Sequence, residues 1–284
     1  MWLKRLTVVT YHGDYMNKSI VGFIFVFLWT VSAFAAPLSN VLIVSIDALH
    51  PDALSAKTTP AIYAQMTQGA YTQNGMSTDP PLTLVSHTAM FTGLSPAESG
   101  KSDNNWQPGE PTIAKNTIFD LAGSYGFWTG YYYSKEKLGF LVNPAVKDHR
   151  FSKDNAVDKA FSSIQQPGNH FIFLHVSGLD SVGPVKGWMS PEYFEELSFI
   201  DEMLSPLIDT ILLKGNYLII ITSDHAGHET VHGSNHPDDF KLPFVIVSDR
   251  FKVDRFQNIA YRVVDLKPIL ERLLASDSGQ SSIH

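Results

Sequence analysis

The sequence contains no cysteine in its 284 residues. This absence excludes structural disulfides, a thiol nucleophile, cysteine-based zinc fingers and a lipid anchor on an N-terminal cysteine. Any bound metal must therefore be held by histidine, aspartate or glutamate side chains. An exported location stays open, because the chain has no thiol that an oxidising compartment would modify.

Positive charge is also scarce. Lysine and arginine contribute 21 residues against 28 aspartates and glutamates, which gives a net charge of −7, and no basic run alternates with aromatic residues. A groove for duplex nucleic acid is therefore excluded as the main function. With 44% hydrophobic residues, no internal repeat and no low-complexity tract, the sequence is typical of a globular chain with a substantial core.

Residues 1–35 have the pattern of a signal peptide. The apolar stretch IVGFIFVFLWTV lies after Lys18, and Ala33 and Ala35 have the A-x-A spacing of a cleavage site. The stretch is shorter than the about 20 residues that a membrane-spanning helix needs, so cleavage is preferred to the alternative of an uncleaved anchor. We therefore expect export to the periplasm or the medium, with no membrane contact after cleavage.

The start of this segment has a second reading. Met16 is followed by asparagine and lysine, a better signal start than Met1, so residues 1–15 are interpreted as an upstream extension. Either way, the expected mature chain is a single domain over residues 36–284.

Short apolar runs rich in β-branched residues alternate with longer helical patterns in this domain, as in βαβ units. We expect strands buried on both faces at residues 41–46, 127–133, 170–176, 217–222 and 243–247. Helices are expected at about 60–69, 117–124, 155–165, 191–213 and 263–274. The sequence thus predicts an α/β fold with a mostly parallel central sheet and helices on both faces.

Three aspartates lie just beyond the ends of predicted strands: Asp47, Asp180 and Asp224. Each one alone is well explained as a turn or helix cap. In an open parallel sheet, however, the carboxyl ends of the strands form the ligand-binding edge, so the three carboxylates are expected to converge. Like charges so close need a counter-ion, and a divalent cation is the usual one.

Four histidines follow the last of these aspartates within twelve residues: His225, His228, His232 and His236. Mixed sets of aspartate and histidine hold zinc and similar ions. The alternative is a solvated loop in which the four histidines bind no metal ion.

Hydroxyl groups precede a predicted short helix in the segment DPPLTLVSHTAMFTGLSP. Thr83 follows a proline pair, so its hydroxyl and the next N–H groups are expected to face an anion at a helix N-terminus. Thr83 or Ser86 is equally well read as a helix cap. The spacing alone does not choose between Thr83, Ser86 and Thr88 as a reacting hydroxyl.

The ordered motifs NVLIVSIDAL, PPLTLVSHTAMFTGLSPAESG, LDSVG, SDHAGH and HG resemble the alkaline phosphatase superfamily. Within it they are most similar to the branch of type I phosphodiesterases and nucleotide pyrophosphatases, over about residues 40–250. The resemblance implies an alkaline phosphatase-like α/β fold, two divalent metal ions, usually zinc, and a metal-activated threonine or serine that attacks phosphorus.

By this resemblance, Asp47 corresponds to the first aspartate ligand, Thr83 to the nucleophile, and Asp224 and His225 to the ligand pair of the SDH motif. These four residues would form one metal site. Asn104 lies 21 residues after Thr83, where family members have an asparagine that binds the phosphoryl oxygen.

The second metal site departs from the family pattern. It should combine Asp180, a histidine four residues later, and the histidine of the HG dipeptide, which is His232. The residue four positions after Asp180 is Pro184, which offers no side-chain nitrogen. Either His228 or His236 moves in, or water completes the site, or the second ion binds weakly in a slow or inactive enzyme.

The resemblance thus implies an exported, metal-dependent phosphoric ester hydrolase. We expect a phosphodiesterase or nucleotide pyrophosphatase that acts on a small phosphoric ester or nucleotide-like substrate through a phospho-threonine at Thr83. The alternatives are a phosphomonoesterase of the same superfamily and, because of Pro184, a weak or inactive ligand-binding homologue. Smaller departures are Ala48 and Ala226, where family members often have glycine.

Overall fold

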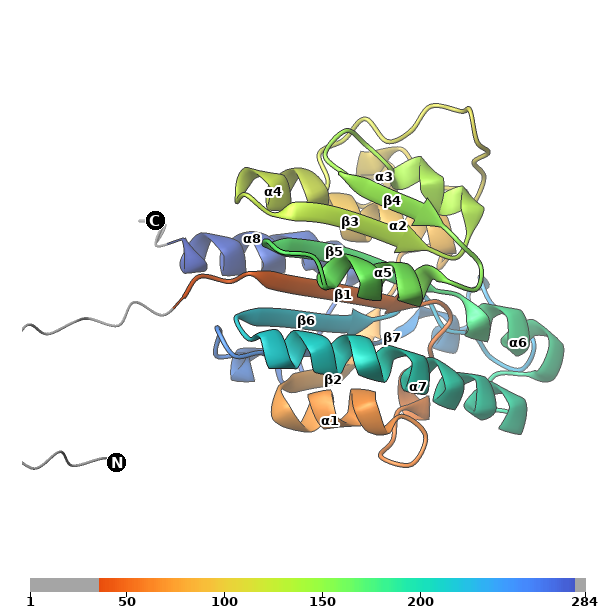
Figure 1. The fold of residues 1–284 in the computed structure, drawn as a ribbon. Coiled ribbons are helices and arrows are strands. Elements are labelled where there is room, and N and C mark those ends of the chain that lie inside the picture. Colours follow the sequence, from red (N-terminus) through yellow and green to blue (C-terminus); the bar gives the residue numbers. More distant parts are fainter. Residues whose placement is uncertain (1–35, 279–284) are drawn as a thin grey trace, which may run out of the picture. The chain divides into compact units, whose positions relative to one another are not determined.

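Seven strands form one sheet in the computed structural model, which describes residues 36–278 (Figure 1). The predicted signal peptide over 1–35 lies outside the described residues. The strands are β1 (Asn40–Ile46), β2 (Ala70–Met76), β3 (Trp128–Tyr133), β4 (Asp148–Phe151), β5 (His170–Val176), β6 (Tyr217–Thr222) and β7 (Lys241–Ser248). Their order across the sheet is β2-β7-β6-β1-β5-β3-β4.

Helices cover both faces of this sheet (Figure 1). The α-helices are α1 (Pro60–Gln68), α2 (Thr83–Thr92), α3 (Pro96–Ser99), α4 (Ile118–Ser124), α5 (Ala156–Ile164), α6 (Gly178–Lys186), α7 (Pro191–Lys214) and α8 (Leu266–Asp277). Short 3₁₀ helices are η1 (Pro51–Ala53), η2 (Glu136–Leu141), η3 (Pro237–Phe240), η4 (Asp254–Phe256) and η5 (Val263–Asp265). No helix within residues 36–278 combines the length and hydropathy required to cross a bilayer.

Two apolar cores lie on opposite sides of the sheet. Strand β1 is buried along its whole length, and its side chains alternate between the cores. Val41 and Ile43 pack with residues of α2, α4 and α8, whereas Leu42 and Val44 pack with residues of α1, α5 and α7. The predicted α/β fold with buried strands and helices on both faces is confirmed.

The sheet is mostly parallel, as predicted, because β6, β1, β5, β3 and β4 pair in parallel. Strand β7 runs antiparallel to its neighbours β6 and β2, although its apolar sequence resembles that of the parallel strands. Parallel neighbours need a crossover, usually a helix, and the segment between β6 and β7 contains only the short η3. The chain therefore returns beside β6 in the opposite direction.

The long helix α7 shows why the helical predictions agree with the structure. The Ser190 hydroxyl accepts a hydrogen bond from the Tyr193 N–H, and Pro191 occupies the first turn, as the sequence predicts. Leu197, Ile200 and the other residues at helical spacing are buried, and Phe194 packs partly buried against the same core.

Besides the four-residue helix α3 and the 3₁₀ helices, three elements were not predicted: β2, β4 and α6. Strand β2 is a polar edge strand with the sequence AYTQNGM and a break in its register with β7 at Thr72–Gly75. Strand β4 has four residues, all at least partly exposed. Helix α6 contains Pro184 in its interior, a residue that normally argues against a helix. In all three, tertiary contacts outweigh the local sequence preference.

Candidate active site

The three strand-end aspartates meet at one edge of the sheet. Asp47 directly follows β1 and Asp224 follows β6, its parallel neighbour, with Ser45 opposite Thr222 in the register. Asp180 lies in the first turn of α6, which follows β5 on the other side of β1. The side chains of Asp47 and Asp224 are fully buried. The strand register therefore brings the two buried carboxylates to the same level, as the sequence predicted.

Three ligand atoms form the inner group of the site: Asp47 Oδ1, Asp224 Oδ2 and His225 Nε2. They lie within 4.8 Å of one another and are buried, and none has a hydrogen-bond partner among the described residues. His225 Nε2 lies 3.3 Å from Asp47 Oδ1 and 3.6 Å from Asp224 Oδ2. Buried polar atoms are rarely left unpaired, so these three converging atoms fit a bound divalent cation.

The electrostatics of the inner group favour positive charge. Burial alone lowers the pKa of His225, but the carboxylates of Asp224 and Asp47 outweigh it and raise the pKa to about 9. Burial alone raises the pKa of Asp47, but Lys135 and the imidazoles of His175 and His225 lower it well below its usual range. The Asp47 carboxylate thus stays ionised, and the inner group stabilises a cation.

An unusual backbone conformation helps to hold this group. Ala48 has a φ of +64°, in the left-handed region that glycine tolerates best. Its carbonyl accepts hydrogen bonds from the Tyr193 hydroxyl and the Trp188 indole, and its N–H donates to Asp224 Oδ1 at 3.3 Å. The neighbouring side chains therefore fix the turn that orients Asp224.

Thr83 is the hydroxyl residue that reaches the site. It is the first residue of α2, it is buried, and its Oγ1 accepts a hydrogen bond from Lys135 Nζ at 3.1 Å. Ser86 Oγ lies instead 2.8 Å from the hydroxyls of two other residues, and Thr88 Oγ1 donates to a backbone oxygen one turn back. The structure thus separates three hydroxyls that the spacing left equivalent.

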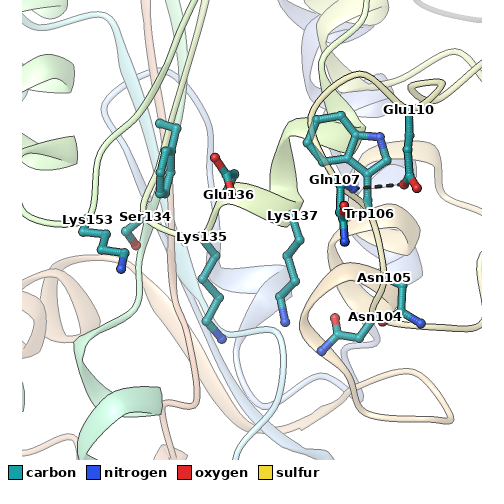
Figure 2. Close-up of a pocket in the computed structure, with 11 residues that line it drawn as sticks. Asn104, Asn105, Trp106, Gln107, Glu110, Ser134, Lys135, Glu136, Lys137 and Lys153 are labelled. Carbon is teal, nitrogen blue, oxygen red and sulfur yellow. Dashed lines mark hydrogen bonds between the residues drawn. The ribbon is translucent and has the colours of Figure 1, made fainter.

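Asn104 lies beside the start of α2, where the Leu84 N–H donates to its Oδ1 at 2.8 Å. This bond leaves the amide N–H groups of Asn104 as donors for a ligand. Asn104 and Lys135 line a cavity of about 780 Å³ together with Trp106, Lys137 and Lys153. In Figure 2 the ammonium groups of Lys135 and Lys137 and the Asn104 amide point toward the same end of this cavity, whereas Lys153 lies apart from them.

An outer group consists of Asp180 and His232, and their ligand atoms lie within 4.8 Å of each other and of a ligand atom of His225, which the inner group also uses. His232 Nε2 lies 3.5 Å from Asp180 Oδ1, and its ring stacks on that of His225 with centroids 4.9 Å apart. Pro184 lies one turn after Asp180 on α6, where a histidine would face the same way, and it is exposed. The outer group thus lacks the ligand that the family pattern supplies.

Neither of the two remaining histidines completes the outer group. His228 Nδ1 lies 2.7 Å from Asp239 Oδ1, and the rings of His228 and His236 stack with centroids 3.8 Å apart. Their ligand atoms form a separate group with Asp239. The alternative in which His228 or His236 moves beside Asp180 is therefore wrong for this structure.

A lysine ammonium lies between the inner and outer groups. Lys135 Nζ lies 2.6 Å from Asp47 Oδ2 and 2.5 Å from Asp180 Oδ2. With this ammonium in contact, Asp180 and His232 do not fit a second divalent cation as well as the inner group fits the first, because like charges repel.

Sequence reasoning missed Lys135 and two buried histidines. Lys135 follows β3 by two residues, so the strand-end argument that found Asp47 applies to it equally well. His175 lies on β5 with Nε2 at 3.0 Å from Asp47 Oδ2, and His87 on α2 contacts Ser45 through Nε2. His175 lies within an apolar run and His87 within a predicted helix, and neither context indicates a site.

Comparison with protein families gives a match over most of the domain. Residues 41–245 match the family described as type I phosphodiesterase / nucleotide pyrophosphatase. Murine ectonucleotide pyrophosphatase/phosphodiesterase 5 has a similar fold, with a TM-score of 0.65 and 16% identity over 83% of this chain and 95% of that one. A protein of the alkaline phosphatase superfamily from Vibrio parahaemolyticus has a TM-score of 0.64 and 18% identity, over 85% of this chain and 67% of that one.

Curated relatives match over shorter stretches. GPI ethanolamine phosphate transferase 1 of Saccharomyces cerevisiae is 34% identical over 86 residues, which are 29% of this chain and 9% of that protein. The catalytic subunit of human GPI ethanolamine phosphate transferase 2 is 26% identical over 106 residues, 35% of this chain and 11% of that protein. The match thus spans about a tenth of the length of these relatives.

Proposed function

We propose, from the premise that this chain belongs to the type I phosphodiesterase / nucleotide pyrophosphatase family, that it is a metal-dependent phosphoric ester hydrolase. Phosphodiesters or nucleotide-like compounds are the proposed substrates. The observation that carries the proposal is the position of the Thr83 hydroxyl at the start of α2, linked through Lys135 to Asp47 of the inner group.

The inner group is the proposed metal site. Asp47, Asp224 and His225 would hold the ion, for which a mixed carboxylate and imidazole set favours zinc. Such an ion supplies Lewis-acid stabilisation of negative charge on the attacking and phosphoryl oxygens. A second ion is the expectation from the family resemblance, and the side chains available to bind it are Asp180, His232 and His225, the last of which also belongs to the inner group.

Thr83 is the proposed nucleophile. Its Oγ1 forms a bond to phosphorus, and the bond from phosphorus to the leaving alcohol breaks with its electron pair on the alcohol oxygen. The threonine proton passes to solvent, and solvent protonates the leaving oxygen. The amide N–H groups of Asn104, whose Oδ1 accepts from the Leu84 N–H at the start of α2, would bind the remaining phosphoryl oxygens.

The second step decides between two related activities. Attack by water on the phospho-threonine gives a hydrolase, whereas attack by an acceptor hydroxyl gives a phosphate transferase. The partial match to GPI ethanolamine phosphate transferases favours transfer as the second candidate. A phosphomonoesterase and an inactive binding homologue remain the alternatives, and export of the chain, predicted from residues 1–35, is part of the proposal.

The test compares three hydroxyl variants on bis(4-nitrophenyl) phosphate, 4-nitrophenyl phosphate and 4-nitrophenyl sulfate. We expect Thr83→Ala to lower kcat by at least about 10³-fold without loss of bound metal, and Thr83→Ser to retain part of the activity. Ser86→Ala is the matched control on the same helix and should keep the parental kcat. Acid quenching of turnover with bis(4-nitrophenyl) phosphate, followed by mass spectrometry, should detect one 4-nitrophenylphosphoryl group on the peptide that contains Thr83.

Parental turnover by Thr83→Ala would overturn the role of this residue. Release of the phosphoryl group only when an alcohol acceptor is added would indicate a transferase instead of a hydrolase.

A further inference from the structure

A cation that belongs to the chain itself, the ammonium of Lys135, lies between the inner and outer groups. Lys135 Nζ makes an ion pair with Asp47 at 2.6 Å and with Asp180 at 2.5 Å, and it donates a hydrogen bond to Thr83 Oγ1 at 3.1 Å. The ammonium of Lys135 thus contacts one carboxylate of the inner group, one carboxylate of the outer group and the hydroxyl of the proposed nucleophile.

The surroundings of Lys135 make this contact specific. Its side chain is 18% exposed, so the ammonium is largely removed from water and depends on its carboxylate partners. A surface lysine in a chance ion pair would be mostly solvated and would contribute little. This ammonium has two carboxylates and a hydroxyl around it.

The backbone before Lys135 is anchored to the inner group. Ser134 Oγ lies 3.1 Å from His175 Nδ1, and His175 Nε2 lies 3.0 Å from Asp47 Oδ2. The turn after β3 is therefore tied to β5 and β1 at the level of the site. The backbone of Lys135 is therefore held in place, and its side chain extends from there to the carboxylates.

The charge balance of the site leads to the same conclusion. Asp47, Asp180 and Asp224 contribute three negative charges at the meeting point of the strands. One divalent ion in the inner group and the ammonium of Lys135 neutralise them. A second divalent ion beside Lys135 would leave an excess of two positive charges and would lie against the ammonium. Asp180 and His232 do not offset this cost, because the third nearby ligand, His225, is shared with the inner group.

We propose that the ammonium of Lys135 replaces the second metal ion, so that this chain is a one-metal enzyme in which Lys135 is a catalytic residue. The inference rests on the proposed function. Lys135 stays protonated throughout and stabilises the negative charge that grows on Thr83 Oγ1 during attack. Loss of the histidine at position 184 is then tolerated, because no ion in the outer group requires it.

Metal stoichiometry tests the proposal without any assay of activity. The full chain is loaded with zinc, dialysed and analysed by inductively coupled plasma mass spectrometry. We expect one zinc per chain in the parent and two in the double variant Lys135→Ala/Pro184→His, which removes the ammonium and restores the missing imidazole. Two fully occupied zinc sites in the parent would overturn the proposal, whether or not any variant folds.

Kinetics on bis(4-nitrophenyl) phosphate give a second test. Lys135→Ala should lower kcat by about 10²–10³-fold with a far smaller change in KM, the size expected for loss of one donor to a reacting oxygen. Added ethylammonium should restore part of kcat, and Lys135→Arg should keep one zinc per chain. Lys186→Ala, which removes an exposed lysine of α6, is the control and should behave as the parent. Parental kcat in Lys135→Ala, or no rescue by the amine, would overturn the role of Lys135.

The two proposals fail in different ways. Parental activity of Thr83→Ala would overturn the proposed function and leave the zinc count as it is. An inactive Thr83→Ala together with two zinc ions in the parent would overturn only the role of Lys135.

Discussion

The inner and outer groups of the site use the same residue types but are built on different supports. Asp47, Asp224 and His225 follow two neighbouring central strands, are fully buried, and keep their ligand atoms unpaired within the described residues. Asp180 and His232 lie on α6 and on a loop, and their side chains are 14% and 29% exposed. The inner group is thus buried at the end of the sheet, whereas the outer group is partly exposed at the surface.

This difference indicates where such a site can change. The strand-end residues are fixed by hydrogen bonds to strands on both sides, so a substitution there leaves a buried charge without its partner. The exposed turn of α6 accepts Pro184 without disturbing the sheet. A lysine from the next strand end along the sheet can then replace a cation in the outer group, while the inner group keeps its composition.

The largest expected effect comes from breaking the inner group. Asp224→Ala removes one of the three converging ligands, so we expect loss of the bound zinc and a fall in kcat/KM of at least about 10³-fold, because the ion contributes several kcal/mol to transition-state stabilisation. Excess chelator should reproduce the loss in the parent. Asp209→Ala, an exposed carboxylate on α7, is the control. Zinc content and kcat/KM near parental values in Asp224→Ala would contradict the metal assignment.

A smaller effect concerns the stability of the inner region as a function of pH. Burial lowers the pKa of His87 to about 4, against the opposing effect of the Asp224 carboxylate. The unfolded chain takes up a proton on this residue below about pH 6.5, whereas the folded chain does so only near pH 4. Stability should therefore fall as the pH drops through this window, with a contribution of up to about 1.4 kcal/mol per pH unit.

The measurement is urea unfolding of the metal-free protein at several pH values. His87→Asn keeps a donor toward the Thr83 carbonyl, which His87 Nδ1 contacts at 2.7 Å, and removes the titrating group. Its stability should decline less steeply between pH 6.5 and pH 4. Identical pH dependence in the variant and the parent would show that His87 does not carry this effect.

The smallest expected effect comes from the outer group. His232→Ala should keep one zinc per chain and lower kcat by only about tenfold, equivalent to about 1.4 kcal/mol. The reason is that His232 stacks on His225 and helps to orient it but binds no ion of its own in the one-metal site. Zinc analysis and steady-state kinetics on the diester check this expectation. Complete loss of zinc or of activity would remove the distinction between the two groups.

Much of the fold was predictable because its central strands are buried on both faces. Residues 41–46, 170–176 and 217–222 were expected as strands and form β1, β5 and β6 within a residue of those bounds. Their burial requires apolar side chains at most positions, which a single sequence displays directly. The convergence of Asp47 and Asp224 followed from parallel pairing alone, and the structure brings them together as expected.

Other features depend on partners that are distant in the sequence. The direction of β7 follows from the lack of a crossover helix, and the polar strand β2 exists because β7 offers it an edge. His87 and His175 form polar contacts that their sequence neighbours do not reveal. His87 Nε2 contacts the Ser45 hydroxyl, and His175 Nε2 contacts the Asp47 carboxylate.

The sequence by itself determined the α/β class, the order of the central strands along the chain, and the set of acidic and imidazole side chains at one edge of the sheet. These properties depend on local hydrophobic patterns and on residue types, which need no knowledge of distant neighbours. Only the tertiary structure decided which hydroxyl faces the site, which histidines leave it, and that Lys135 enters it. Those outcomes depend on distances of a few ångströms between residues that are far apart in the sequence, such as Asp47 and His175, which are 128 positions apart. The packing of the sheet and its helices sets these distances.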